Sequence, residues 1–183
     1  MSSLRPPAPA KLIVGMFSPH RSAFDGVAEA LTGVYGTPDN ISPWMPFDQT
    51  DYYTAEMGGP LFRRMMAFAD LIDPGRLPSV KHFCHDLEQG TMTGTGRRVN
   101  IDPGYMNRAR FVLATGKDFT HRIYIGEGVY ADLTLVVQSG ALVPLPWTYP
   151  DYRQPAMIGF LQGVRHKYLA DLADRDVSPP SPR

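Results

Sequence analysis

The chain contains one cysteine, Cys84, and no excess of charge of either sign. A single thiol cannot form an intrachain disulfide, so a disulfide-stapled secreted scaffold is excluded and a reducing compartment is favoured. The 18 basic and 18 acidic side chains cancel. Nucleic-acid binders usually carry a basic excess that neutralises phosphates, so we expect no nucleic-acid partner.

Long apolar runs are also missing. No stretch approaches the ~18 consecutive apolar residues that mark a membrane span, so no membrane partner is expected. The first ten residues carry three prolines and lack the apolar segment of a signal peptide. We therefore expect the protein in the cytoplasm, while its oligomeric state and cofactors stay open.

The remaining composition is that of a globular protein. Of 183 residues, 43% are hydrophobic and 20% are charged, which suits one domain with a substantial core. We expect a flexible, Pro-rich arm over 1–10, a single α+β domain over 11–173 and a disordered tail over 174–183.

Local patterns in the first half of the chain predict alternating strands and helices. An apolar run indicates a buried strand, Ser22 with Asp25 resembles a capping box, and Asp73 followed by proline is typical of a helix start. The predicted elements are a strand at 11–17, a helix from Ser22 to Gly36, an extended segment at 41–47, a strand (rather than a helix) at 62–72 and a helix at 75–89.

The second half is richer in predicted strands. Glycines between β-rich runs indicate a hairpin. The predicted elements are a strand at 97–101 ended by Asp-Pro-Gly at 102–104, a strand at 111–114, a hairpin over 121–137, a strand at 141–145 and a helix at 155–173. The order favours an α+β fold with a ferredoxin-like β-α-β-β-α-β core, extended by a C-terminal hairpin and a closing helix.

Three long motifs, at 98–105, 114–130 and 144–153, together with 47–53, carry a family resemblance. Over about residues 11–170 the chain resembles a family of bacterial and archaeal proteins catalogued only as a domain of unknown function, with an Asp-Pro-Gly signature. The resemblance implies no established activity, fold or ligand, although some members carry an automatic GTP-binding label. The P-loop that would support this label is absent, because Gly116-Lys117 is followed by Asp118 rather than Ser or Thr.

The densest set of polar side chains lies between positions 98 and 122. Period-two alternation in a strand would place Arg98, Asn100 and Asp102 on one face. We predict His121 and Asp102 as catalytic residues, because a histidine pKa lies near neutrality. The predicted ligand-binding residues are Arg98, Asn100, Tyr105, Lys117, Asp118 and Arg122, whose cations suit a phosphate or carboxylate. The alternative interpretation is that these groups cap turns and form structural ion pairs.

Three further groups of residues are candidate sites. Asp48, Asp51, Tyr52, Tyr53 and Glu56 could hold a cation, but their spacing matches no established loop. His82, Cys84 and His85 lack further ligands, so no metal site and no structural zinc are expected. The aromatic, Pro-rich segment 144–153 could stack on a ligand, dock a partner or simply join the last helix to the sheet.

These patterns leave two functions open. The preferred one is a small-ligand binding protein, with or without catalytic activity, whose ligand is anionic or nucleotide-like. The alternative is a non-catalytic protein–protein interaction module that uses the aromatic 144–153 segment.

Overall fold

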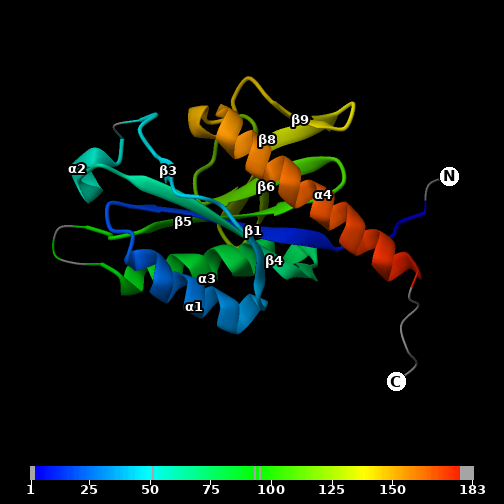
Figure 1. Ribbon diagram of the computed structural model, residues 1–183, viewed down its shortest axis with the longest axis horizontal. Coiled ribbons are helices and arrows are strands. Elements are labelled where there is room, and N and C mark those ends of the chain that lie inside the picture. Colours follow the sequence, from blue (N-terminus) through cyan, green and yellow to red (C-terminus); the bar gives the residue numbers. More distant parts are fainter. Residues whose placement is uncertain (1–2, 51, 93, 95, 178–183) are drawn as a thin grey trace.

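The structure is a computed structural model that describes residues 3–50, 52–92, 94 and 96–177, with the side chains described up to residue 174 (Figure 1). Residues 3–9 are exposed and have no regular secondary structure, and the first strand begins at Ala10. The predicted disordered tail lies outside the described residues from position 178. None of the helices in the described part has the length and apolar character needed to cross a bilayer.

Nine strands form one sheet over the described residues, and the strand pairings among these residues are antiparallel. The sheet order is β2-β4-β1-β5-β6-β8-β7, with β3 also pairing with β4 and β9 also pairing with β8. The strands are β1 (Ala10–Ser18), β2 (Pro38–Ile41), β3 (Met45–Pro46), β4 (Phe62–Ile72), β5 (Asn100–Met106), β6 (Arg110–Thr115), β7 (Arg122–Gly126), β8 (Val129–Gln138) and β9 (Ala141–Pro144).

Helices cover both faces of this sheet, which confirms the α+β class. The helices are α1 (Ala23–Tyr35), α2 (Thr54–Met57), α3 (Leu77–Gly90) and α4 (Pro155–Val177), with 3₁₀ turns η1 (Pro74–Arg76) and η2 (Pro150–Arg153). In Figure 1, α1 and α3 lie together on one side of the strands and α4 crosses the other side. Each helix layer buries its own apolar cluster against the sheet.

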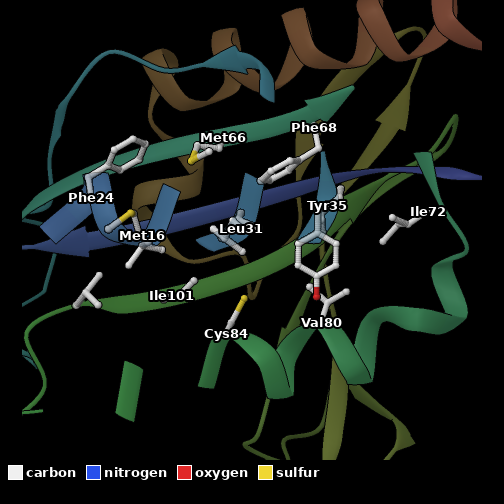
Figure 2. Close-up of a cluster of buried hydrophobic side chains, with 14 residues drawn as sticks. Met16, Phe24, Leu31, Tyr35, Met66, Phe68, Ile72, Val80, Cys84 and Ile101 are labelled. Carbon is white, nitrogen blue, oxygen red and sulfur yellow. The ribbon is translucent and has the colours of Figure 1, made fainter. Parts of the chain in front are cut away.

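The first strand is central and buried over its whole length, as the apolar run predicts. Leu12, Val14 and Met16 pack into the cluster beneath α1 and α3, whereas Ile13 packs into the cluster beneath α4. A strand covered on both faces needs apolar side chains in both directions, so it appears as a continuous run rather than an alternation. Figure 2 shows the first cluster, with Val80 and Cys84 of α3 directed toward the strands.

Of the two predicted helix caps, the one at Asp73 is confirmed and the one at Ser22 is wrong. The Asp73 carboxylate accepts a 2.8 Å hydrogen bond from the Gly75 amide, so the Asp-Pro-Gly at 73–75 starts η1 and then α3 as predicted. The predicted Ser22 cap is wrong, because its side chain makes no capping hydrogen bond. The α1 helix is held instead by its buried apolar face, which includes Phe24 and Leu31.

The prediction that the second Asp-Pro-Gly ends a strand is also wrong. Rather than ending a strand, residues 102–104 lie inside β5, which starts only at Asn100. At Pro103, β5 pairs only with β1, because β6 pairs with β5 from Gly104 onward. The backbone N–H group that proline lacks is therefore not needed for pairing with β6. Gly104 permits the close approach of β6, because a Cβ there would lie 2.3 Å from the Val112 carbonyl oxygen.

The predicted hairpin is confirmed as β7 and β8. Its two loop residues, Glu127 and Gly128, both have positive φ (54° and 73°), as a tight type I′ connection requires. Ser139 and Gly140 repeat this arrangement between β8 and β9. β7 and β9 therefore lie along the same side of β8, one after the other.

Candidate functional site

A cleft of about 720 Å³ opens at the end of the sheet where β5 begins and β6 ends. Residues from 47–50, 52–53, 81–88 and 149–152 complete its walls, so distant parts of the chain meet there. Its aromatic lining residues are Phe47, Tyr52, Tyr53, Tyr149 and Tyr152. Its titratable and amide lining residues include Arg63, Lys81, His85, Glu88, Arg97, Asn100, Lys117 and Asp102, Asp132 and Asp151.

Arg63 of β4 is the buried cation of this cleft, with 4% of its surface exposed. Its guanidinium group donates a hydrogen bond to Asp151 of η2 and lies 3.7 Å from Asp102 of β5. Burial alone lowers the pKa of Arg63, but Tyr152 and the two carboxylates raise it overall. The group therefore stays charged and joins three elements.

Aromatic rings surround the same guanidinium group. Its central carbon lies 4.5 Å from the ring centroid of Phe47, 5.0 Å from that of Tyr152 and 5.2 Å from that of Phe17. Cation–π contacts of this kind are worth more when the cation is desolvated. The rings thus exclude water from one side of the ion pairs.

Asp102 is a partly exposed carboxylate that lines the cleft. Its Oδ2 atom accepts a 2.8 Å hydrogen bond from the Asn100 side chain, and its Oδ1 atom lies 4.0 Å from Nζ of Lys81. Lys81 also donates to the Ile101 carbonyl oxygen at 3.0 Å. The β5 alternation places Asn100 and Asp102 side by side, as the period-two pattern predicts.

Glu88 comes from the last turn of α3 and is 4% exposed. Its Oε1 atom accepts a hydrogen bond from the Ile101 amide, and its Oε2 atom lies 3.8 Å from Arg97. Burial raises the pKa of Glu88, and the attraction of Lys81 and the Ile101 amide does not offset this. A carboxyl group with a raised pKa is suited to proton transfer.

Lys117 lies on the rim of the cleft. Its Nζ atom donates a 3.2 Å hydrogen bond to the Tyr52 hydroxyl and lies 4.8 Å from the centroid of that ring. Within the part of the chain that the structure describes, no carboxylate lies within salt-bridge distance of this amine. Lys117 is thus a solvent-facing cation held beside an aromatic ring.

His121 and Arg122 form the outer side of one wall. Both bind Oδ2 of the buried Asp132, at 3.2 Å and 3.0 Å respectively. Arg122 also donates to the Tyr149 hydroxyl, and the His121 ring stacks on Trp147 with centroids 5.1 Å apart. Asp132 and Tyr149 line the cleft, whereas His121 and Arg122 are not among its lining residues.

The 144–153 segment hydrogen-bonds to a stretch of β8 that pairs with neither β7 nor β9. The Trp147 indole donates to the Leu133 carbonyl oxygen at 2.8 Å, and the Thr148 hydroxyl donates to the Thr134 carbonyl oxygen. These two carbonyls lie between the part of β8 that pairs with β7 and the part that pairs with β9. The segment therefore joins the sheet to α4, and its Tyr149, Asp151 and Tyr152 side chains reach the cleft.

The cleft thus contains some of the residues predicted from the sequence and not others. Asn100, Asp102 and Lys117 line it. Arg98 and Asp118 are exposed and do not line it, and Tyr105 packs with Leu77 and Val112 instead. Tyr105 follows Asp102 by three positions in the strand, so the alternation directs it to the other face.

Sequence reasoning missed several lining residues: Arg63, Lys81, Glu88, Arg97 and Asp132. Asp151 and Tyr152 were included only as part of the aromatic 144–153 segment. The available signal was a charged residue within a strand that is rich in apolar residues, as with Arg63 in β4 and Asp132 in β8. Buried charges are rare unless they are paired, so such positions indicate a polar network.

The other sequence candidates are distributed as follows. Tyr52 and Tyr53 line the cleft, Glu56 pairs with Arg97 at 2.9 Å, Asp48 is exposed, and Asp51 lies outside the described residues. Cys84 is a core residue, and burial raises its pKa to about 12, which excludes a reactive thiolate at neutral pH. Within the described ranges, no three His, Cys, Asp or Glu side chains are placed to hold a metal ion.

Comparison with known protein families matches residues 8–168 to the family described as Domain of unknown function (DUF4416). The match covers the whole sheet and most of α4. No curated protein matches the chain, and no solved structure matches it. The geometry of the cleft is therefore the basis for a functional assignment.

Proposed function

Since the chain belongs to the DUF4416 family, we propose from its cleft that it is a small-ligand binding protein whose ligand is anionic and carries a planar ring, as a nucleotide does. One observation carries this proposal: a cleft of about 720 Å³ is lined by both aromatic rings and cations. Ligand pockets of about 300–1,000 Å³ typically combine apolar walls with a few placed polar groups.

The distribution of charge favours an anion at the rim rather than at the floor. Arg63, Lys81 and Arg97 each have a carboxylate within 4.0 Å. Among the described residues, Nζ of Lys117 has only the Tyr52 hydroxyl as a hydrogen-bond partner. An anionic group beside Lys117 would gain a charge-assisted hydrogen bond without displacing an existing ion pair.

The aromatic side chains are the groups proposed to bind the planar ring of the ligand. Tyr52 and Tyr149 are exposed although both line the cleft, so their rings are accessible to a ligand. A planar ring stacked on a tyrosine is worth about 1–3 kcal/mol in comparable base–aromatic contacts. Tyr52 lies next to Lys117, so one ligand can meet both groups.

Asp102 and Glu88 are the residues proposed to transfer protons if the ligand undergoes acid–base chemistry. Both line the cleft, whereas His121 is occupied by Asp132 and Trp147 outside it. The proposed catalytic pair therefore keeps Asp102 from the sequence prediction and replaces His121 with Glu88.

We also propose that β1–α1–β2–β4–α3–β5 forms a ferredoxin-like core and that the protein works in the cytoplasm. The antiparallel order β2-β4-β1-β5 and the placement of α1 and α3 on one face support the first proposal. The single, buried Cys84 supports the second. Superposition on split β-α-β folds and fractionation of cells test them.

Thermal-shift and calorimetric titrations test the ligand class. ATP and GTP are compared with adenosine, which lacks the anion, and with inorganic phosphate, which lacks the ring. A specific ligand raises the melting temperature by mass action, and we expect nucleotides to do so more strongly than either fragment. Equal responses to phosphate and nucleotides, or no response to any of the four, would contradict the proposal.

A further inference from the structure

A second cavity, of about 330 Å³, lies where β5 ends and β6 begins. Four parts of the chain line it: the N-terminal arm at Pro7 and Ala8, the start of η1, the turn between β5 and β6, and α4 at Tyr168. The cleft is lined instead by the start of β5 and the end of β6. The two cavities therefore lie at opposite ends of the β5–β6 pair and share no lining residue.

The charged residues that line this second cavity are both cations. Arg108 and Arg110 line it, and none of its lining residues is an aspartate or a glutamate. Within the described part of the chain, neither guanidinium group has a carboxylate within salt-bridge distance or donates a hydrogen bond. In the cleft, by contrast, each of the inner cations is paired with a carboxylate. Two unpaired cations give the second cavity a positive potential, which favours an anionic ligand.

The backbone that carries the two arginines is well ordered. Oδ1 of Asn107 accepts 2.9 Å hydrogen bonds from the amides of Ala109 and Arg110, and the Asn107 amide donates to the Arg110 carbonyl oxygen at 3.0 Å. An asparagine that bonds to the backbone two residues on stabilises a tight turn. The Arg108 carbonyl oxygen also accepts a 3.2 Å hydrogen bond from Arg165 of α4. A ligand would therefore meet a turn that is already formed, which lowers the entropy cost of binding.

Two tyrosines complete the cavity. The Tyr168 hydroxyl donates a 2.9 Å hydrogen bond to the Pro9 carbonyl oxygen, which holds the arm in place as one wall. The Tyr105 hydroxyl makes no hydrogen bond to any described residue. Burial raises the pKa of Tyr105 and of Tyr168, and the charges of Arg110 and Arg108, respectively, oppose the rise. Tyr105 therefore stays protonated and offers a donor within electrostatic range of a guanidinium group.

We propose that this cavity is a second ligand site, which binds a small oxyanion with two or more negative charges, such as a phosphate monoester or pyrophosphate. Guanidinium groups bind phosphoryl and carboxylate oxygens through paired N–H donors, and the Tyr105 hydroxyl adds a third donor group. A volume of about 330 Å³ is near the lower end of the range of about 300–1,000 Å³ for ligand pockets. The cavity therefore suits a small anion, and this inference does not depend on the ligand proposed for the cleft.

Calorimetric titration of the full chain with inorganic pyrophosphate, at constant ionic strength and without divalent metal, tests the proposal. We expect saturable binding with a dissociation constant below about 1 mM. Arg108→Ala and Arg110→Ala should each raise this constant at least about tenfold, because each removes a charge-assisted hydrogen bond. Both side chains are exposed, so both variants should keep the wild-type circular dichroism spectrum. Titration with malonate then shows whether phosphoryl or carboxylate oxygens bind more tightly.

Two further variants are the controls. Arg98→Ala removes an exposed arginine that lines neither cavity, and it should leave the dissociation constant unchanged. A loss equal to that of Arg108→Ala would indicate an adventitious ion only and would overturn the proposal. Lys117→Ala should also leave pyrophosphate binding unchanged. Binding that Lys117→Ala abolishes and the Arg108 and Arg110 variants keep would place the anion in the cleft, which overturns this inference and not the proposed function. A wild-type chain that binds neither probe up to about 10 mM would overturn it as well.

Discussion

The guanidinium group of Arg63 donates a hydrogen bond to the carboxylate of Asp151, 88 residues further along the chain. Arg63 belongs to β4 and Asp151 to η2, the turn that precedes α4. The ion pair therefore connects the sheet to the segment that forms one wall of the cleft. Both groups are largely buried, so the loss of Arg63 leaves the Asp151 carboxylate buried without its counter-ion, whereas Arg63 also has Asp102 at 3.7 Å.

Arg63→Ala should lower the free energy of unfolding by about 3–5 kcal/mol, because it leaves Asp151 buried without its counter-ion. Arg64→Ala is the matched control, since Arg64 lies over the rings of Phe24 and Trp44 and donates to the Ser42 carbonyl oxygen. Its loss should cost only about 1 kcal/mol. Urea denaturation at pH 7 measures both values, and equal losses would contradict the prediction.

Tyr152→Phe should leave the free energy of unfolding unchanged or raise it by up to about 2 kcal/mol. The Tyr152 hydroxyl is buried and makes no hydrogen bond to any described residue. Phenylalanine removes this hydroxyl and keeps the ring contacts with Arg63 and Phe111.

Tyr168→Phe is the control for this change. The Tyr168 hydroxyl is also buried but donates a 2.9 Å hydrogen bond to the Pro9 carbonyl oxygen. Its removal should cost about 1 kcal/mol. Thermal or urea unfolding should therefore separate two chemically identical changes by their sign, and a loss at both positions would show that Tyr152 has a partner.

Glu88→Gln should flatten the pH dependence of stability and raise the free energy of unfolding at neutral pH. Burial raises the pKa of Glu88, so the folded chain binds this proton more tightly than the unfolded chain. The contribution of this group is therefore most favourable below the unfolded pKa of about 4.3 and falls as the pH rises through the raised folded value. Each unit of the rise corresponds to about 1.4 kcal/mol.

The glutamine carbonyl can still accept the hydrogen bond from the Ile101 amide, so the comparison isolates the charge. Unfolding is followed between about pH 4 and pH 8. Asp86→Asn, an exposed change on the same helix, should leave the profile as it is in the wild type. A Glu88→Gln profile parallel to that of the wild type would refute the raised pKa.

Lys117→Ala should weaken nucleotide binding at least about tenfold, because it removes a charge-assisted hydrogen bond to the proposed anionic group. Arg98→Ala should leave the affinity unchanged, since Arg98 is exposed and does not line the cleft. Calorimetry of both variants shows whether the ligand binds in the cleft, which Lys117 lines and Arg98 does not. Equal losses would show that general positive charge, rather than the Lys117 position, attracts the ligand.

Local structure was largely predictable from the sequence. The apolar run at 11–17 became the central strand β1, the Asp73 cap started η1 and α3, and a glycine-containing loop closed the β7–β8 hairpin. These features depend on neighbouring residues alone: a carboxylate meets an amide two positions away, or a turn needs positive φ. Such signals can be recognised in the sequence without knowing which strands pair.

The site was decided by tertiary structure. Arg63, Asp102, Asp132 and Asp151 come from three strands and a 3₁₀ turn, and they meet because β4, β1, β5, β6 and β8 lie next to one another in that order. Strand order depends on pairings between distant segments, and a shift of one residue would turn every side chain to the other face. Composition and local spacing identify the polar residues, but only the strand pairing determines that Asp102 faces the cleft and Tyr105 does not.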